Sequence, residues 1–167
     1  MKGEKLYIKA ELVLDQLYAQ SKLLSIDEKK ILYSEYMKLL KISAYKGFPD
    51  AQYGLAQHYD NIGFWGVPNP YYNVYKKFYW YSKAVSNDHA AAHNSLADMY
   101  ERGEGCTKDI RKALKLYKKS AELGDVYGKK NYFLFKKQLK KAGLLDWATD
   151  GVDPPQLEKL LKQLYNS

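Results

Sequence analysis

Apolar residues recur at helical spacing along almost the whole chain, with polar residues between them. We find no segment with the strict apolar–polar alternation that is typical of a strand. The pattern therefore predicts an all-α chain with eight helices, over residues 4–20, 26–46, 50–62, 74–87, 89–102, 109–123, 125–141 and 154–165. Since the connections are short, consecutive helices should run antiparallel.

Capping signals precede four of these helices. A Ser, Asp or Asn side chain at this position accepts a hydrogen bond from a backbone N–H group of the first turn. The predicted N-caps are Ser25, with Glu28 completing a capping box, then Asn73, Asp109, and Asp153, which a proline follows.

The chain repeats itself. Residues 55–59 align with 96–100 at an offset of 41, and residues 80–85 align with 116–121 at an offset of 36. Self-similarity with a period of about 20–50 residues predicts a solenoid, in which each unit buries its apolar face against its neighbours. We therefore expect a single repeat domain over 1–167, an α-α superhelix of about four antiparallel helix pairs. Its units are 4–46, 47–88, 89–124 and 125–167, the last including a C-terminal capping helix.

The repeat also assigns roles to turn and core residues. Gly47 and Gly124 fit the left-handed residue that ends a helix, and Asp88 occupies the same turn position. The segment 142–151 fits no repeat position and is expected to fold back over the last apolar face. Four of the seventeen tyrosines recur at equivalent positions and are expected in the core: Tyr18, Tyr59, Tyr100 and Tyr117.

Composition narrows the functional class. Hydrophobic residues make up 46% and charged residues 28%, which excludes a disordered chain, and no apolar run reaches the about 18 residues of a membrane span. A single cysteine and the lack of an apolar leader predict a cytoplasmic protein, or a periplasmic one if a signal peptide has been removed.

The net charge of +8 is concentrated in one stretch. Residues 108–141 contain twelve Lys/Arg and three Asp/Glu, whereas the rest of the chain is close to neutral. This stretch predicts a protein partner with an acidic surface. The alternative is a nucleic-acid-binding module that uses the basic 108–141 face.

Residues 89–124 carry a spaced alanine, leucine and tyrosine, a glycine turn, an aspartate before lysine-alanine, a further tyrosine and a closing glycine; these are Ala92, Leu96, Tyr100, Gly103, Gly105, Asp109, Lys112, Ala113, Tyr117 and Gly124. This pattern resembles a Sel1-like repeat, a relative of the tetratricopeptide repeats. Leu116 stands where the family usually has tryptophan. The resemblance implies an adaptor that binds proteins, bacterial or eukaryotic, or an immunity protein that neutralises a toxin by stoichiometric binding. The family's cysteine-rich branch is associated with β-lactam hydrolysis, but its paired cysteines are missing here.

Two surfaces are candidate partner-binding sites. If the first helix of each pair lines a groove, as in tetratricopeptide repeats, the groove residues are Tyr53, Gln57, Asp60, Asn94, Asp98, Glu101, Lys130 and Lys137. The loop between the third and fourth helices is five residues longer than the equivalent loop of the next unit. It carries large aromatic side chains that could anchor an interface, namely Phe64, Trp65, Tyr71 and Tyr72. These rings could instead fold back over the helix pair.

Chemistry at a catalytic or metal centre is not indicated. His89 and His93 lie four positions apart, but no third ligand has suitable spacing. No histidine is placed to activate Cys106, and the glycines beside it lack the lysine-serine ending of a phosphate loop. We therefore expect no enzyme activity, no metal, no cofactor and no small-molecule ligand.

Overall fold

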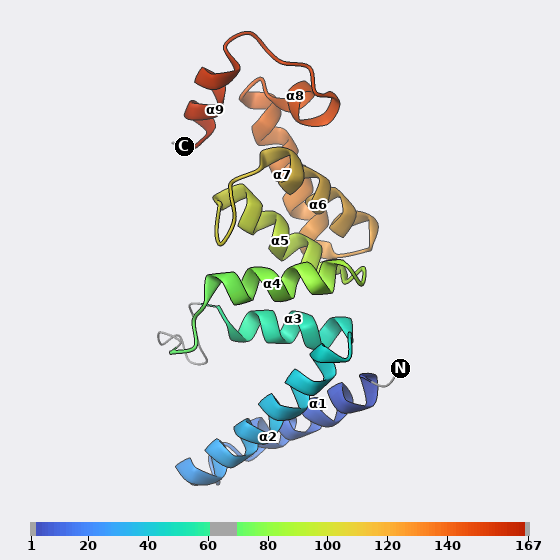
Figure 1. Ribbon diagram of the computed structural model, residues 1–167, viewed down its shortest axis with the longest axis vertical. Helices are drawn as coiled ribbons and strands as arrows, with labels where there is room; N and C mark the ends of the chain where they lie inside the picture. The colour runs from blue at the N-terminus through green and yellow to red at the C-terminus, as the bar shows by residue number, and fades with distance from the viewer. Residues whose placement is uncertain (1–2, 61–69, 166–167) are drawn as a thin grey trace. The chain divides into compact units, whose positions relative to one another are not determined.

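The protein is described from a computed structural model that covers residues 3–60 and 70–165 (Figure 1). All regular elements in these ranges are α-helices, as the sequence predicts. They are α1 (Glu4–Ala19), α2 (Ile26–Tyr45), α3 (Pro49–His58), α4 (Val74–Val85), α5 (Ala90–Arg102), α6 (Ile110–Glu122), α7 (Val126–Lys141), α8 (Leu145–Asp150) and α9 (Leu157–Tyr165).

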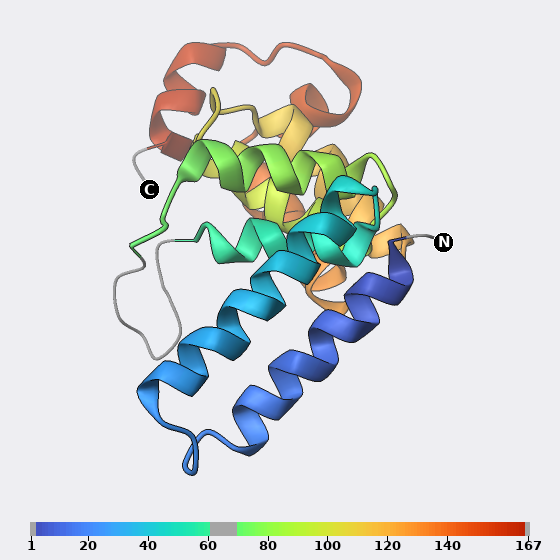
Figure 2. The same cartoon turned by 60° about the horizontal axis from the view of Figure 1, so that its bottom comes forward.

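The helices form two compact units, Met1–His89 and Ala90–Ser167. In the first unit α1 packs on α2, α2 on α3, and α3 on α4. Figure 2 shows α1 and α2 as a long antiparallel hairpin whose connected end extends beyond α3. In the second unit α5 packs on α6 and on α7, α6 packs on α7, and α8 lies against both α6 and α7. The expectation of one repeat domain over the whole chain stays a prediction.

Helix starts follow the predicted caps. The Ser25 hydroxyl accepts from the Glu28 backbone N–H at 3.3 Å, and the Glu28 carboxylate accepts from the Ser25 N–H at 2.8 Å. Asn73 and Asp109 each accept from the backbone N–H three residues further on, at 2.9 Å. These bonds satisfy donors that the first turn leaves unpaired.

Helix ends follow the predicted turn residues. Gly47 has φ +85° and Gly124 has φ +91°, and Asp88 has φ +55° at the equivalent position. Aspartate is one of the few side chains that adopt the left-handed region readily. The repeat therefore keeps its backbone geometry where it loses its glycine.

The last helix differs from the prediction. It begins at Leu157, and Asp153 does not cap it. Pro154 is followed by Pro155, and a residue before proline is disfavoured in the α region, so the helix cannot begin at Pro154. Gln156, with φ +63°, accepts a bond from the Leu160 N–H at 3.1 Å and opens the helix instead.

Two other bounds also differ. Helix α3 ends at His58, whereas the sequence predicted a helix over 50–62. Residues 61–62 lie outside the described residues. The segment 142–151 contains a short helix, α8, that the sequence did not predict. It folds back as expected, since Leu144 and Ala148 are buried against α6 and α7.

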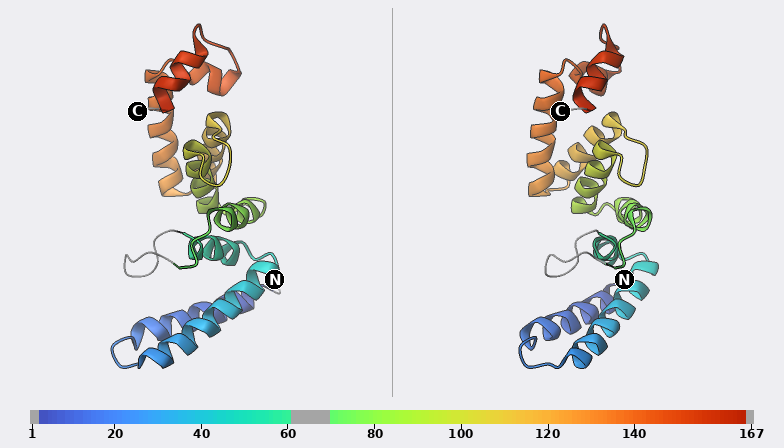
Figure 3. Two further views of the ribbon diagram at one scale, coloured as in Figure 1. Left: turned by 60° about the vertical axis from the view of Figure 1, so that its left-hand side comes forward. Right: turned by 90° about the vertical axis from the view of Figure 1, so that its left-hand side faces the viewer.

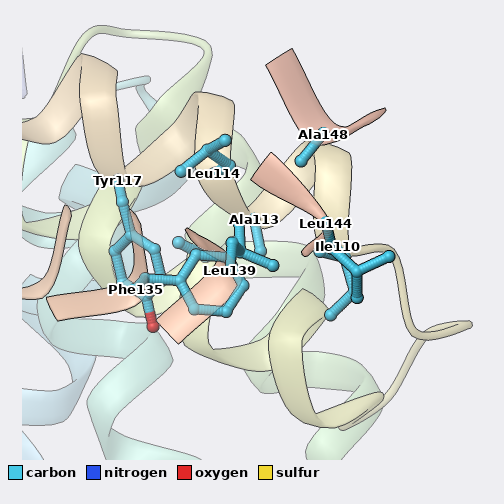
Figure 4. Packing of buried hydrophobic residues seen from close by; sticks show 9 residues of the cluster. Ile110, Ala113, Leu114, Tyr117, Phe135, Leu139, Leu144 and Ala148 are labelled. Atoms are coloured by element: carbon cyan, nitrogen blue, oxygen red, sulfur yellow. The ribbon is translucent and has the colours of Figure 1, made fainter. Parts of the chain in front are cut away.

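The core of the second unit lies between α6, α7 and α8. Figure 4 shows apolar side chains from these helices meeting one another, with Leu139 at the centre and fully buried. The rings of Tyr117 and Phe135 meet edge to face at 5.5 Å. Such a core stabilises the fold by removing apolar area from water.

The four recurring tyrosines differ in their burial. Tyr117 is buried as predicted, and Tyr59 and Tyr100 are partly buried. The prediction for Tyr18 is wrong, because its side chain is 45% exposed. Tyr18 lies near the end of α1, and among the helices that the structure describes only α2 packs extensively on α1.

A pair of leucines on α7 tests this core. Leu139→Ala should lower the free energy of unfolding by about 2–5 kcal/mol, because it opens a cavity in a fully buried site. Leu134→Ala, on the same helix at a side chain 49% exposed, should change it by less than about 0.5 kcal/mol. Urea denaturation followed by circular dichroism measures both. Equal losses of unfolding free energy in the two variants would contradict the assignment of Leu139, and not Leu134, to the core.

Candidate functional site

A groove of about 920 Å³ lies in the first unit between α2, the end of α3 and the start of α4. We call it the basic aromatic groove. Its cations are Lys30, Lys38, Lys41 and Lys76. Its rings are Tyr33, His58, Tyr59, Tyr71 and Tyr72.

One face of α2 supplies most of the groove. Residues 30, 33, 34, 37, 38 and 41 line it, and their steps of three and four place them on one side of a helix. This face was not predicted from the sequence, because the expected groove lay on the first helix of each pair and α2 is the second helix of its pair. The signal was present in the run from Lys30 to Lys41, which carries three lysines and a tyrosine at helical spacing.

His58 joins the three walls of the groove. Its Nδ1 lies 2.9 Å from the hydroxyl of Tyr33 on α2, within hydrogen-bond distance. Its ring stacks on Tyr71 at 5.2 Å and meets Tyr59 edge to face at 5.3 Å. The aromatic side chains therefore already hold one another in place, which lowers the entropy lost when a ligand binds.

The groove carries positive charge without acidic residues in its described lining. Lys76 Nζ lies 5.3 Å from the centre of the Tyr59 ring, where the ring face attracts a cation. Lys30 contacts Asp27 at 3.2 Å outside the groove, but both side chains are strongly exposed, so this pair contributes little. The groove is suited to an anionic ligand.

Burial shifts the titration of the two central groups. The pKa of His58 is lowered, first by burial and then by the charge of Lys41. The pKa of Tyr33 is raised by burial and further by Tyr71 and Tyr18. Both groups are therefore neutral at pH 7, and the positive charge of the groove comes from its lysines.

The predicted groove residues of the first unit lie on α3 and just after it. Tyr53 stacks on His89 at 4.5 Å, and Gln57 is exposed. Asp60 forms an ion pair with Lys77 at 3.0 Å. None of the three lines the basic aromatic groove.

Two predicted groove residues of the second unit have partners on neighbouring residues. Asn94 accepts a hydrogen bond from Asn131 of α7 at 2.9 Å. Asp98 pairs with Arg102, one turn further along α5, at 2.9 Å. These contacts occupy part of the polar face that the sequence assigned to a partner.

The remaining predicted groove residues behave differently. Glu101 accepts a hydrogen bond from the Tyr117 hydroxyl at 2.8 Å, and burial raises its pKa. Lys130 and Lys137 are exposed on α7. Binding by these residues stays a prediction.

The aromatic loop is described in part. Phe64 and Trp65 lie outside the described residues. Tyr71 and Tyr72 are 59% and 50% exposed, and both line the basic aromatic groove. The described end of the loop thus belongs to this groove.

Part of the 108–141 stretch is used within its own unit. Three of its cations lie over aromatic rings: Lys108 over Tyr165 at 4.0 Å, Arg111 over Trp147 at 4.7 Å, and Lys112 over Tyr100 at 4.3 Å. The Arg111 contact links α6 to α8, the Lys112 contact links α6 to α5, and the Lys108 contact links the α5–α6 connection to the end of α9. Some of the positive charge of this stretch therefore takes part in contacts within the unit, and these contacts were not predicted from the sequence.

The residues considered for metal binding or catalysis make packing contacts. His89 lies 3.5 Å from Asp50, and His93 is buried. The described residues contain no group of three or more His, Cys, Asp or Glu side chains that could hold a metal. Cys106 Sγ contacts the Met99 carbonyl at 3.6 Å, and burial raises the pKa of its thiol, which opposes formation of the thiolate.

The two central helix pairs match a known repeat. The Sel1 repeat model matches residues 49–89 and 90–125, which contain α3 with α4 and α5 with α6. The chain carries two Sel1 repeats. Sel1 repeat proteins are generally non-catalytic scaffolds for protein–protein interaction.

Solved structures show the same repeat fold. A Sel1 repeat protein from Oxalobacter formigenes is 27% identical, with a TM-score of 0.56 over 77% of this chain and 95% of that one. A protective antigen of uropathogenic Escherichia coli strains, with an SLR fold, is 19% identical, with a TM-score of 0.58 over 94% of this chain and 32% of that one. These likenesses confirm the predicted Sel1-like solenoid fold. Across 3–60 and 70–165, none of the helices combines the length and apolar character needed to span a membrane.

Because the pKa of His58 is lowered, the stability of the folded protein should decrease as the pH falls. The unfolded chain binds a proton at this residue near pH 6.5, whereas the folded chain binds it only at lower pH. The contribution of neutral His58 to stability is therefore complete above this pH and is lost as the pH falls. The stability advantage of the protein over His58→Gln should shrink between pH 7 and pH 5, by at most about 1.4 kcal/mol per pH unit. Urea denaturation at several pH values measures it, and an advantage that grows on acidification would contradict the assignment.

Proposed function

We propose that this chain is a non-catalytic interaction module whose basic aromatic groove binds an acidic segment of a protein partner. The observation that carries the proposal is a groove lined by four lysines and five rings, with no carboxylate in its described lining. The Sel1 repeats support the class of function, since such repeats generally serve as interaction scaffolds.

The two kinds of side chain have different roles in this proposal. The lysines attract an acidic segment over distances of about 10 Å and favour it over a basic one. The rings supply apolar contact area on side chains that already pack around His58. Both kinds of side chain then contribute to affinity, and the lysines give selectivity for an acidic segment.

Stoichiometric binding of this kind fits an adaptor, and it also fits an immunity protein that neutralises a toxin. The number of partners separates these roles. Co-purification with one tight partner would favour an immunity protein, whereas several weak partners would favour an adaptor.

Binding of nucleic acid through the 108–141 face is the second candidate. It is favoured by exposed lysines along α7, which are Lys129, Lys130, Lys136, Lys137, Lys140 and Lys141. Aromatic side chains that stack on bases usually accompany a single-strand site. Tyr100, Trp147 and Tyr165 already lie under cations of this unit, which makes this candidate the weaker one.

Charge reversal in the groove tests the proposal. A fluorescein-labelled oligoglutamate peptide serves as the probe, and its affinity for the full chain is measured by fluorescence anisotropy. Lys38→Glu combined with Lys41→Glu should weaken binding at least about tenfold, because it places carboxylates where the probe needs cations. Lys5→Glu combined with Lys9→Glu changes the net charge equally on exposed α1 positions outside the groove and should weaken binding less than about threefold.

Two results would contradict the proposal. Equal losses in both double variants would mean that the probe senses only net charge. Binding of single-stranded RNA that Lys130→Glu with Lys137→Glu abolishes, together with no response of the peptide to the groove variants, would favour the nucleic-acid function. Circular dichroism confirms that each variant is folded.

A further inference from the structure

A second cavity, of about 600 Å³, lies between α1 and α2 near their connection. Apolar side chains from both helices line it, namely Leu14, Leu17 and Ile26. Its lining also includes the rings of Tyr18 and Tyr33 and the cations Lys22, Lys29 and Lys30. We call it the hairpin cavity. It combines an apolar interior with a positively charged rim.

The hairpin cavity is open because no third helix of residues 3–60 and 70–165 packs extensively on this end of the hairpin. Figures 2 and 3 show α1 and α2 side by side, with their connected end beyond α3. Ile26 is 71% exposed, and the neighbouring Leu23 is also strongly exposed. Apolar side chains gathered at an exposed surface mark sites where another molecule binds.

The hairpin cavity adjoins the basic aromatic groove. Lys30 and Tyr33, one turn apart on α2, line both. A segment that lies along α2 in the groove therefore reaches the hairpin cavity without leaving the surface of the first unit.

We propose that the partner segment is amphipathic: its carboxylates meet the lysines of the groove while a large apolar side chain enters the hairpin cavity. This inference rests on the proposed function. On a helical segment, positions about three or four apart share one face, so an acidic residue beside the apolar one would meet Lys30 at the junction. Burial of the apolar side chain adds affinity that charge alone does not supply. The lysine rim discriminates against segments with basic residues at these positions.

A protein segment fits this surface better than an anionic membrane does. Asp27 and Glu28 lie at the start of α2, beside the hairpin cavity, and Asp27 is strongly exposed. Carboxylates at this end of the hairpin oppose approach to anionic lipid headgroups. They leave the lysine-lined face of α2 open to a peptide.

Two labelled peptides of equal length and charge test the inference with the full chain. One contains glutamate with leucine at helical spacing, and the other has alanine in place of each leucine. The chain should bind the leucine peptide about tenfold more tightly than the alanine peptide. Leu17→Gln combined with Ile26→Gln should bring this ratio to about one and leave the affinity for the alanine peptide unchanged. Ile26→Gln alone, at an exposed position, should lower the ratio without affecting the fold.

Ile8→Gln is the matched control. This side chain is also exposed on α1 but does not line the hairpin cavity, so the variant should keep the ratio. A ratio near one in the unmodified chain, or a ratio that survives in the double variant, would overturn the inference while leaving the groove proposal intact. Failure of the Lys38→Glu and Lys41→Glu variant to weaken either peptide would instead contradict the proposed function. Binding to phosphatidylserine vesicles that the double variant abolishes, without discrimination between the peptides, would assign the cavity to a membrane and overturn the inference.

Discussion

Within each unit, α1 to α4 and α5 to α7, consecutive helices pack on one another, and small buried side chains recur at one repeat position. These are Ala10, Ala51, Ala92 and Gly128, which follow one another at offsets of 41, 41 and 36. Between α6 and α7, a Cβ at Gly128 would lie 2.5 Å from the Cβ of Ser120. Backbones at this distance leave no room for a larger residue, so the register of one helix fixes that of the next. The buried Ser120 hydroxyl donates to the Ala90 carbonyl at the start of α5 at 2.8 Å, so this polar group is satisfied.

The same close packing explains where the surface stays open. The connected end of the α1–α2 hairpin projects past α3, so one side of the far part of α2 is not packed against another helix of the described part of the chain. Lysines and rings occupy that side of α2, and His58 fixes the rings at the point where α3 ends. The candidate groove is thus a consequence of unequal helix lengths in the first unit, together with the longer connection between α3 and α4.

Much of the fold was predictable because repeat proteins depend on local signals. Caps at Ser25, Asn73 and Asp109 and the left-handed turn at Asp88 all follow from side-chain chemistry within a few residues. The start of the last helix was missed because adjacent prolines override the N-cap signal of Asp153. The site was harder to predict. The lysines of α2 face His58 and Tyr71 only after three helices pack, and charge counted along the chain pointed to 108–141 instead.

The central claim is that an acidic ligand binds the face of α2 that lies opposite His58. Amide NMR of the ¹⁵N-labelled full chain, titrated with an oligoglutamate peptide, tests it most directly. Binding in the basic aromatic groove should give saturable shift changes that centre on residues 30–41, 58–59 and 71–76. Changes centred on 126–141 in place of these residues would contradict it.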